Sequence, residues 1–233
     1  MNKRKNCYHY QPSPLEHIAN IITHALPVIP SFYCFNNLKE LTNQDLTKQD
    51  LTKQELIFIS LYGMCMILTF IISSLFHYFS YLGNNEKLRS IFHLCDRTII
   101  YIFIAASYTP WLSIPGSDTF THLMIWSIWI AALSGVAAQF VVNERLLHDY
   151  EIILYLMIGV IPAVIIAYYH TDHPGLSQFV KGGLAYVSGI FFFRSDGSIP
   201  FAHAIWHLFV IAGVTFHYQA ICQLLLAHLG KTF

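Results

Sequence analysis

The feature that most restricts the fold of this chain is a series of seven long stretches that are nearly free of Asp, Glu, Lys and Arg. An ionised side chain at the centre of a bilayer is costly, so such stretches mark membrane spans. A helix of about 20 residues crosses the roughly 30 Å hydrocarbon core of a bilayer. The predicted spans are 17–38, 56–80, 98–117, 119–143, 152–171, 174–193 and 197–230.

Two features interrupt these spans. Lys181 is the one charged residue inside them, and its long stem lets the ammonium group reach the membrane interface. Pro27 and Pro30 in the first span and Pro162 in the fifth predict kinks. The resulting prediction is an all-α integral membrane protein, with residues 16–230 forming a single bundle of seven transmembrane helices.

Composition agrees with this class of protein. Hydrophobic residues make up 55% of the chain and charged residues 11%, whereas a soluble domain has about 25% charged residues. The 13 basic and 13 acidic side chains cancel, so no overall field indicates a nucleic-acid partner. The five cysteines include no C-x-x-C spacing, which argues against a disulfide framework and a zinc finger.

The basic residues predict the orientation. Eight of them lie in the connections on the N-terminal side of the spans and five on the opposite side. Because cytoplasmic connections are enriched in Lys and Arg, we expect a cytoplasmic N-terminus with residues 1–15 as a tail. Residues 39–55 are predicted as a polar loop between the first two spans. This segment contains the repeat LTNQD-LTKQD-LTKQE, whose period of five matches neither helix nor strand.

The last span begins with two histidines four residues apart, His203 and His207, in the stretch HAIWHLF. Side chains at i and i+4 lie one turn apart on the same helix face. An imidazole inside a bilayer is costly unless it has a partner, and two on one face can bind one metal ion. Taken alone, such a pair is more often two hydrogen-bonded packing residues. The pair also lacks the Glu of the H-E-x-x-H zinc protease helix.

The alternation of the spans predicts which other polar groups reach this pair. Even-numbered spans end, and odd-numbered spans begin, on the N-terminal side of the membrane. His77 near the end of the second span and Asp96 at the start of the third therefore lie at the level of His203 and His207. Ser73 lies four residues before His77 and so on the same helix face.

These residues predict a zinc centre. Three neutral imidazoles and one water form the open tetrahedral arrangement of a catalytic zinc site, with Zn–N distances of about 2.0 Å. We therefore predict that His77, His203 and His207 bind Zn²⁺. Asp96 would hydrogen-bond to the water and accept its proton, and the Ser73 hydroxyl would hold the water or a substrate carbonyl.

Other interpretations of the same residues stay open at this point. Asp96 could instead form an interfacial ion pair with the adjacent Arg97, and Ser74 is a weaker alternative to Ser73. His217 lies ten residues beyond His207 and thus about 15 Å deeper, too far to bind the same ion. Each of the remaining candidate histidines is single at its membrane level: His24, His93 and His217.

Three stretches of the chain resemble one known family. EHIANIITHA, FHLCDRTIIYIFIAASYTPWL and FFRSDGSIPFAHAIWHLFV are similar to the progestin and adipoQ receptor family, which includes adiponectin receptors and haemolysin III-like proteins. The resemblance is closest to its monocyte to macrophage differentiation branch and extends over nearly the whole chain. It implies a seven-helix bundle with zinc near the cytoplasmic face, bound at the positions of His77, His203 and His207. Asp96 matches the family's water-binding Asp and Ser73 its motif Ser.

The resemblance implies two alternative functions. One is a receptor-like membrane protein that contains zinc and acts in signalling or lipid metabolism. The other is a zinc-dependent hydrolase that cleaves a lipid amide or ester, because adiponectin receptors and alkaline ceramidases resemble lipid amidases. The expected partner is a membrane lipid, as ligand or substrate, and the expected location is a Golgi or endolysosomal membrane. A transporter is disfavoured, since no internal repeat and no paired acidic residues at mid-membrane are present.

Overall fold

The computed structural model of the protein describes residues 10–43, 51–114, 118–142, 144–169 and 171–230. Within these ranges the chain forms α-helices and no β-strand. Seven helical segments are long and apolar enough to cross a membrane, with the first two helices together making one of them. This confirms the prediction of an all-α, seven-span fold. The helices are α1 (Pro14–Ala25), α2 (Val28–Asn43), α3 (Lys53–Leu82), α4 (Glu86–Ser113), α5 (Thr119–Val141), α6 (Glu144–Tyr169), α7 (Leu176–Arg194) and α8 (Ala202–His228).

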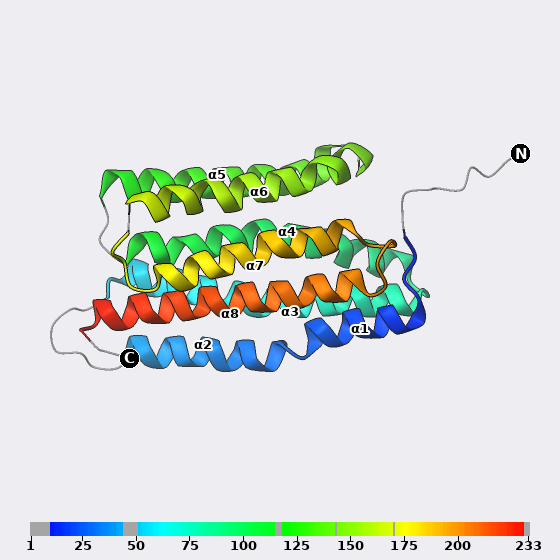
Figure 1. Ribbon diagram of the computed structural model, residues 1–233, viewed down its shortest axis with the longest axis horizontal. Helices are drawn as coiled ribbons and strands as arrows, with labels where there is room; N and C mark the ends of the chain where they lie inside the picture. Colours follow the sequence, from blue (N-terminus) through cyan, green and yellow to red (C-terminus); the bar gives the residue numbers. More distant parts are fainter. Residues whose placement is uncertain (1–9, 44–50, 115–117, 143, 170, 231–233) are drawn as a thin grey trace, which may run out of the picture.

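The helices run alternately between the two ends of one elongated bundle (Figure 1). In this view α5 and α6 lie along one edge, followed by α4 and α7, then by α3 and α8, with α1 and α2 along the opposite edge. We call the end where α1 begins, at the right of Figure 1, the α1 end. Helices α4, α6 and α8 also begin there, and α3, α5 and α7 end there. Polar residues of different helices can therefore meet at the α1 end, as the alternation of the spans predicts.

The first span is broken into two helices at Pro27. Helix α1 ends at Ala25, Leu26 and Pro27 form a turn, and α2 starts at Val28. A proline inside a helix removes one backbone hydrogen bond and clashes with the preceding turn. The predicted distortion of this span is thus confirmed, whereas α6 runs through Pro162 as one helix.

Both ends of the segment predicted as a polar loop, residues 39–55, are helical. Helix α2 continues to Asn43 and α3 begins at Lys53, while residues 44–50 lie outside the described part of the chain. The Thr52 backbone N–H donates to the Glu55 carboxylate at 2.7 Å, and the Glu55 N–H donates to the Thr52 hydroxyl at 3.2 Å. This reciprocal pair is a capping box, which starts a helix. The connector therefore ends within the last repeat unit, at Thr52, and not after residue 55 as predicted.

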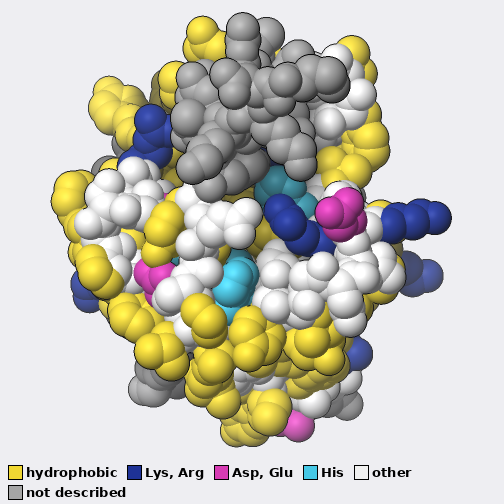
Figure 2. All heavy atoms as spheres, turned by 90° about the vertical axis from the view of Figure 1, so that its right-hand side faces the viewer, with side chains coloured by type: hydrophobic (Ala, Val, Ile, Leu, Met, Phe, Trp, Pro, Cys, Tyr) yellow, Lys and Arg dark blue, Asp and Glu magenta, His cyan; other side chains and the backbone are white. Residues whose placement is uncertain are grey.

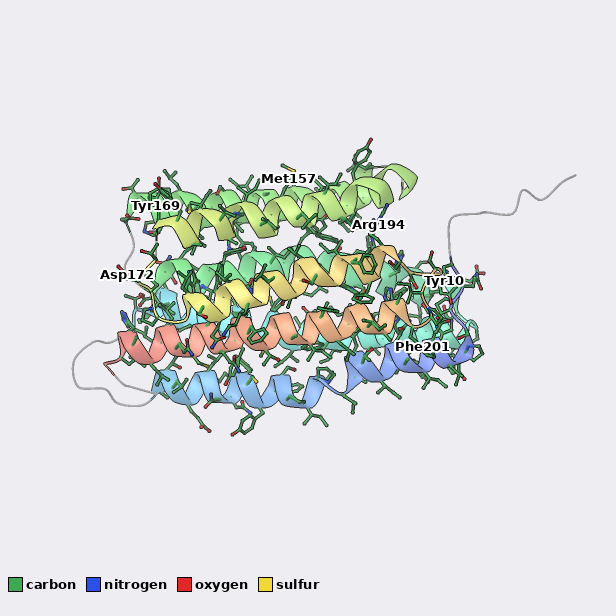
Figure 3. All side chains as sticks on the ribbon, viewed as in Figure 1. Tyr10, Met157, Tyr169, Asp172, Arg194 and Phe201 are labelled. Carbon is green, nitrogen blue, oxygen red and sulfur yellow. The ribbon has the colours of Figure 1, made fainter. Side chains whose placement is uncertain are left out.

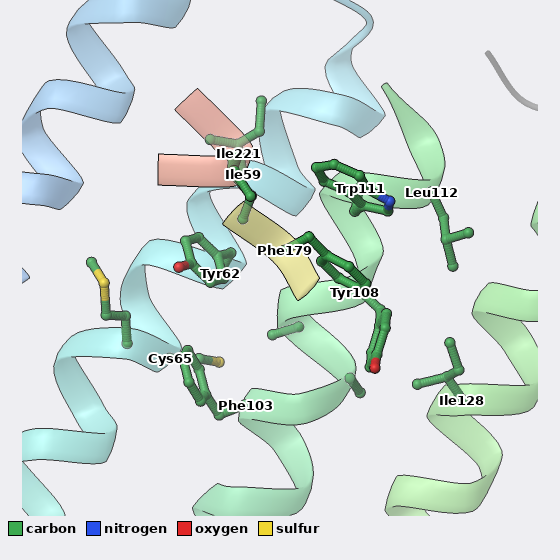
Figure 4. Close-up of a cluster of buried hydrophobic side chains, with 14 of the residues drawn as sticks. Ile59, Tyr62, Cys65, Phe103, Tyr108, Trp111, Leu112, Ile128, Phe179 and Ile221 are labelled. Carbon is green, nitrogen blue, oxygen red and sulfur yellow. The ribbon is translucent and has the colours of Figure 1, made fainter. Parts of the chain in front are cut away.

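The largest apolar side chains pack in the half of the bundle far from the α1 end. Tyr62 of α3, Trp111 of α4 and Phe179 of α7 meet there, and the rings of Trp111 and Phe179 stack with centroids 4.9 Å apart (Figure 4). The buried polar residues of α1, the end of α3 and the start of α8 lie in the other half. The bundle thus separates an apolar core from a polar region near the α1 end.

Helices α7 and α8 approach each other closely at a glycine. A Cβ atom added to Gly182 would lie 2.0 Å from Cδ2 and 2.6 Å from Nε2 of His217. His217 is buried and its ring also contacts that of Phe179, with centroids 5.1 Å apart. The neighbouring Gly183 has open space where its Cβ would be. Of these two adjacent glycines, only Gly182 is therefore needed for the close contact with His217.

A polar link joins α4 to the outer helices α5 and α6. The Arg97 Nε donates to both carboxylate oxygens of Glu151, at 3.0 and 2.9 Å. Gln139 Nε2 and the Tyr155 hydroxyl donate to the same carboxylate at 2.8 and 2.6 Å. Glu151 is 8% exposed, so its charge depends on these partners. A buried charge left without its partner is strongly destabilising.

We predict that Gly182→Ala destabilises the protein and that Gly183→Ala does not. The extra methyl group at position 182 forces His217 out of place, and overpacking of this kind costs about 1–3 kcal/mol. Thermal unfolding of the two variants in detergent, followed by circular dichroism, measures the difference. Equal melting temperatures for both variants would contradict the close α7–α8 packing.

We also predict that Glu151→Gln lowers the melting temperature, because Arg97 then keeps a charge without a counter-charge, at a cost of about 3–5 kcal/mol. Replacing both residues, Arg97→Met with Glu151→Met, should restore part of the loss. Glu40→Gln is the control, because Glu40 is exposed on α2. If Glu151→Gln has the same melting temperature as wild type, the Arg97–Glu151 ion pair does not stabilise the packing of α6 against α4.

Candidate metal centre

Three buried histidines from three helices meet near the α1 end of the bundle. They are His24 of α1, His77 of α3 and His207 of α8, and one ring nitrogen of each lies within 4.8 Å of the others. Their exposed fractions are 4, 4 and 1%. The ring centroid of His207 lies 3.8 Å from that of His24 and 4.9 Å from that of His77. We call these three residues the imidazole cluster.

His203 lies beside the imidazole cluster, one turn before His207. Its ring centroid is 4.6 Å from that of His207 and 5.2 Å from that of His77. Its Nδ1 lies 3.2 Å from the carboxylate of Asp196, and 22% of its side chain is exposed. The structure thus brings together the three predicted ligands His77, His203 and His207, with His203 nearest the surface. Figure 2, which faces the α1 end, shows histidine side chains near the middle of that face.

The prediction that His24 is single at its membrane level is wrong, because His77 and His207 lie at the same level. The structure places His24 in the imidazole cluster from the last turn of α1. The available signal was the stretch EHIANIITHA, which carries part of the family resemblance and contains His24. The other two candidates are not members of the imidazole cluster: the His93 ring stacks on Phe76, the residue before His77, with centroids 5.0 Å apart, and His217 packs against Gly182.

The imidazole cluster fits a metal ion by its chemistry. Nδ1 of His24 and Nε2 of His77 are buried and have no hydrogen-bond partner among the described residues. A buried polar atom without a partner is costly, and a metal ion would use the lone pair of such a nitrogen. Neutral imidazole nitrogens are preferred ligands of zinc. The residues present can therefore hold a zinc ion.

The predicted site residues Ser73 and Asp96 lie next to each other. The Ser73 hydroxyl is hydrogen-bonded to the Asp96 carboxylate, which also interacts electrostatically with His203. Ser73 is buried. The alternative Ser74 donates to the backbone carbonyl of Phe70 at 2.6 Å. Ser73 is therefore the serine that meets Asp96.

Asp96 and Arg97 are adjacent in sequence but have different partners. Arg97 binds Glu151 of α6, with Nη2 2.8 Å from a carboxylate oxygen. Asp96 is hydrogen-bonded to Ser73 of α3. Arg97 thus pairs with Glu151, and the alternative of an Asp96–Arg97 ion pair is wrong.

Helix α8 carries His203 and His207, and a residue of α1 holds its first turn. Its first turn follows Phe201, whose φ of 59° is left-handed and whose side chain provides no cap. Instead, the Phe201 N–H donates to the Glu16 carboxylate at 3.0 Å. The Tyr10 hydroxyl donates to the same carboxylate at 2.6 Å, which raises the pKa of Tyr10 to about 12. Figure 3 shows Tyr10 and Phe201 at the α1 end. Glu16 therefore fixes the start of α8 against α1.

Comparison with known proteins identifies the family. The family model described as haemolysin-III related matches residues 14–218. The monocyte to macrophage differentiation factor of Homo sapiens is 39% identical over 220 residues, which cover 93% of this chain and 87% of that protein. Hemolysin-3 of Bacillus cereus is 30% identical over 200 residues, covering 85% of this chain and 86% of that protein. The Hemolysin-3 homolog of Bacillus subtilis (strain 168) is 31% identical over 202 residues, covering 85% and 89%. On this similarity, the chain belongs to the haemolysin-III-related family of multi-pass membrane proteins.

Proposed function

We propose that this protein is a zinc-containing, receptor-like membrane protein that acts in membrane signalling or lipid metabolism. The observation that supports it is the imidazole cluster, with two buried ring nitrogens that have no hydrogen-bond partner among the described residues. Buried imidazoles at membrane depth are costly without a partner. A zinc ion shared by several of them would connect the first, second and last spans of the bundle.

The proposed ligands are His77 and His207, with His203 or His24 completing the set. His203 is the ligand implied by the family resemblance, and it lies one turn from His207. His24 has a ring nitrogen within 4.8 Å of ring nitrogens of both His77 and His207, and His203 is not part of this group. We further propose that the N-terminus is cytoplasmic and that the protein resides in Golgi or endolysosomal membranes, with a membrane lipid as its ligand.

We predict that the purified protein contains about one zinc ion per chain, and that His77→Ala and His207→Ala lose it. The reason is that both residues belong to every ligand set that the geometry allows. Inductively coupled plasma mass spectrometry of protein purified without added metal gives the stoichiometry. His122→Ala, which changes an exposed histidine of α5, should leave the zinc content unchanged.

His24→Ala and His203→Ala, measured in the same way, identify the third ligand, because only the variant that removes a ligand should bind zinc more weakly. Zinc contents that are equal in wild type, His77→Ala and His207→Ala would overturn the proposed function.

A second candidate function is hydrolysis of a lipid amide or ester, which the Ser73–Asp96 pair favours. When bound, zinc supplies Lewis-acid chemistry that polarises a carbonyl group and makes water a better nucleophile. Beside it, the Asp96 carboxylate is placed to accept a proton. The Ser73 hydroxyl donates to that carboxylate and so keeps it oriented towards the histidines.

We predict for this second function that protein in lipid discs releases fatty acid from ceramides or lysolipids, and that Asp96→Asn abolishes the release. The amide side chain keeps the shape of Asp96 but cannot accept the proton. Mass spectrometry of the lipid products measures turnover. Asp172→Asn, at the opposite end of the bundle (Figure 3), is the matched control, and absence of turnover on every lipid tested would argue against the hydrolase.

A further inference from the structure

The imidazole cluster has a neighbour in α1 that is not a ligand. The Thr23 hydroxyl oxygen lies 2.7 Å from Nδ1 of His207, across 184 residues of sequence. Thr23 directly precedes His24, so α1 contacts the cluster through two successive residues. The contact is the one hydrogen bond that the structure gives to a ring nitrogen of His207 within the described part of the chain.

The direction of this hydrogen bond follows from counting protons. The Thr23 hydroxyl also lies 2.8 Å from the carbonyl oxygen of Ala19 and 3.1 Å from that of Asn20. A carbonyl oxygen can only accept, and a hydroxyl has one proton to donate. Threonine in a helix commonly donates this proton to the carbonyl four residues earlier. When the hydroxyl donates to Ala19, its lone pair faces His207, and in this arrangement Nδ1 is the donor.

A neutral imidazole carries one proton, so a donor at Nδ1 leaves Nε2 with a free lone pair. A metal ion requires this lone pair. Histidine ligands of metals almost always donate their other N–H group to an oxygen, which fixes the tautomer and the ring orientation. His207 is 1% exposed, so water does not compete for its Nδ1.

We propose that Thr23 is a positioning residue for the metal centre: it accepts the Nδ1 proton of His207 and so holds the tautomer whose Nε2 can bind the ion. The inference about the metal rests on the proposed zinc site, but the hydrogen bond and the tautomer are properties of the metal-free protein. Helix α1 then has two roles at the cluster, because Thr23 orients one imidazole and His24 supplies another.

The experiment compares Thr23→Val with Thr23→Ser in metal-free protein whose histidines carry ¹⁵N. Valine keeps the shape of threonine and removes the acceptor, whereas serine keeps the hydroxyl. Nitrogen chemical shifts distinguish the two tautomers of a neutral imidazole, and the His207 signals are assigned by their loss in His207→Gln. We expect the Nδ1–H tautomer in wild type and Thr23→Ser, and the Nε2–H tautomer in Thr23→Val.

A zinc titration against a chromophoric chelator gives the second readout. Loss of a residue that orients a ligand typically weakens metal affinity by about 10- to 100-fold, and we expect this for Thr23→Val but not for Thr23→Ser. Circular dichroism of the metal-free proteins controls for folding, and Thr23→Ala replaces Thr23→Val if the latter unfolds.

The two claims fail in different ways. An Nε2–H tautomer in wild type, or an unchanged tautomer and affinity in both Thr23→Val and Thr23→Ala, would overturn the role of Thr23. A wild-type protein with the Nδ1–H tautomer that binds no zinc would overturn the proposed function and keep only the hydrogen bond.

Discussion

The arrangement of this bundle depends on the cost of placing uncharged imidazoles inside a membrane without partners. His24, His77 and His207 come from three helices, are almost fully buried, and have ring nitrogens within 4.8 Å of one another. Large apolar side chains could fill the same space without this cost, as they do around Trp111 in the other half of the bundle. The proposed zinc ion would offset the cost of this polar region, and the apolar half supplies packing that holds the helices in place.

Much of the fold could be predicted because membrane spans have a simple physical signature. Stretches nearly free of charged residues predicted the seven spans, and the alternation of the spans predicted that His77, Asp96, His203 and His207 lie at one end. Sequence did not identify the contribution of α1, because the side of the helix on which His24 meets α3 and α8 is set by packing between helices. The start of α3 was missed although the capping box T-K-Q-E at Thr52 is a local sequence signal for a helix start. Contacts between helices, such as Thr23 with His207, have no local signal at all.

In helix α4, two successive residues contact different neighbouring helices. Asp96 is hydrogen-bonded to Ser73 of α3, beside the histidines. Arg97, the next residue, binds the Glu151 carboxylate of α6. Because successive residues of a helix point about 100° apart, fixing one of them also fixes the direction of the other. The ion pair with α6 thus restricts the rotation of α4 that would turn Asp96 away from the imidazole cluster.

The order of the cluster residues along the chain has a consequence for biosynthesis. His24 lies in the first helix and His207 in the last, and the start of that last helix is held by Glu16. During translation the two earlier imidazoles enter the membrane long before their partner is made. If the imidazole cluster binds the proposed zinc ion, binding can be completed only after α8 has docked against α1, which would make it a late event in maturation. A nascent chain stalled before α8 would have His24 and His77 in the membrane without the imidazole of His207 that completes the cluster.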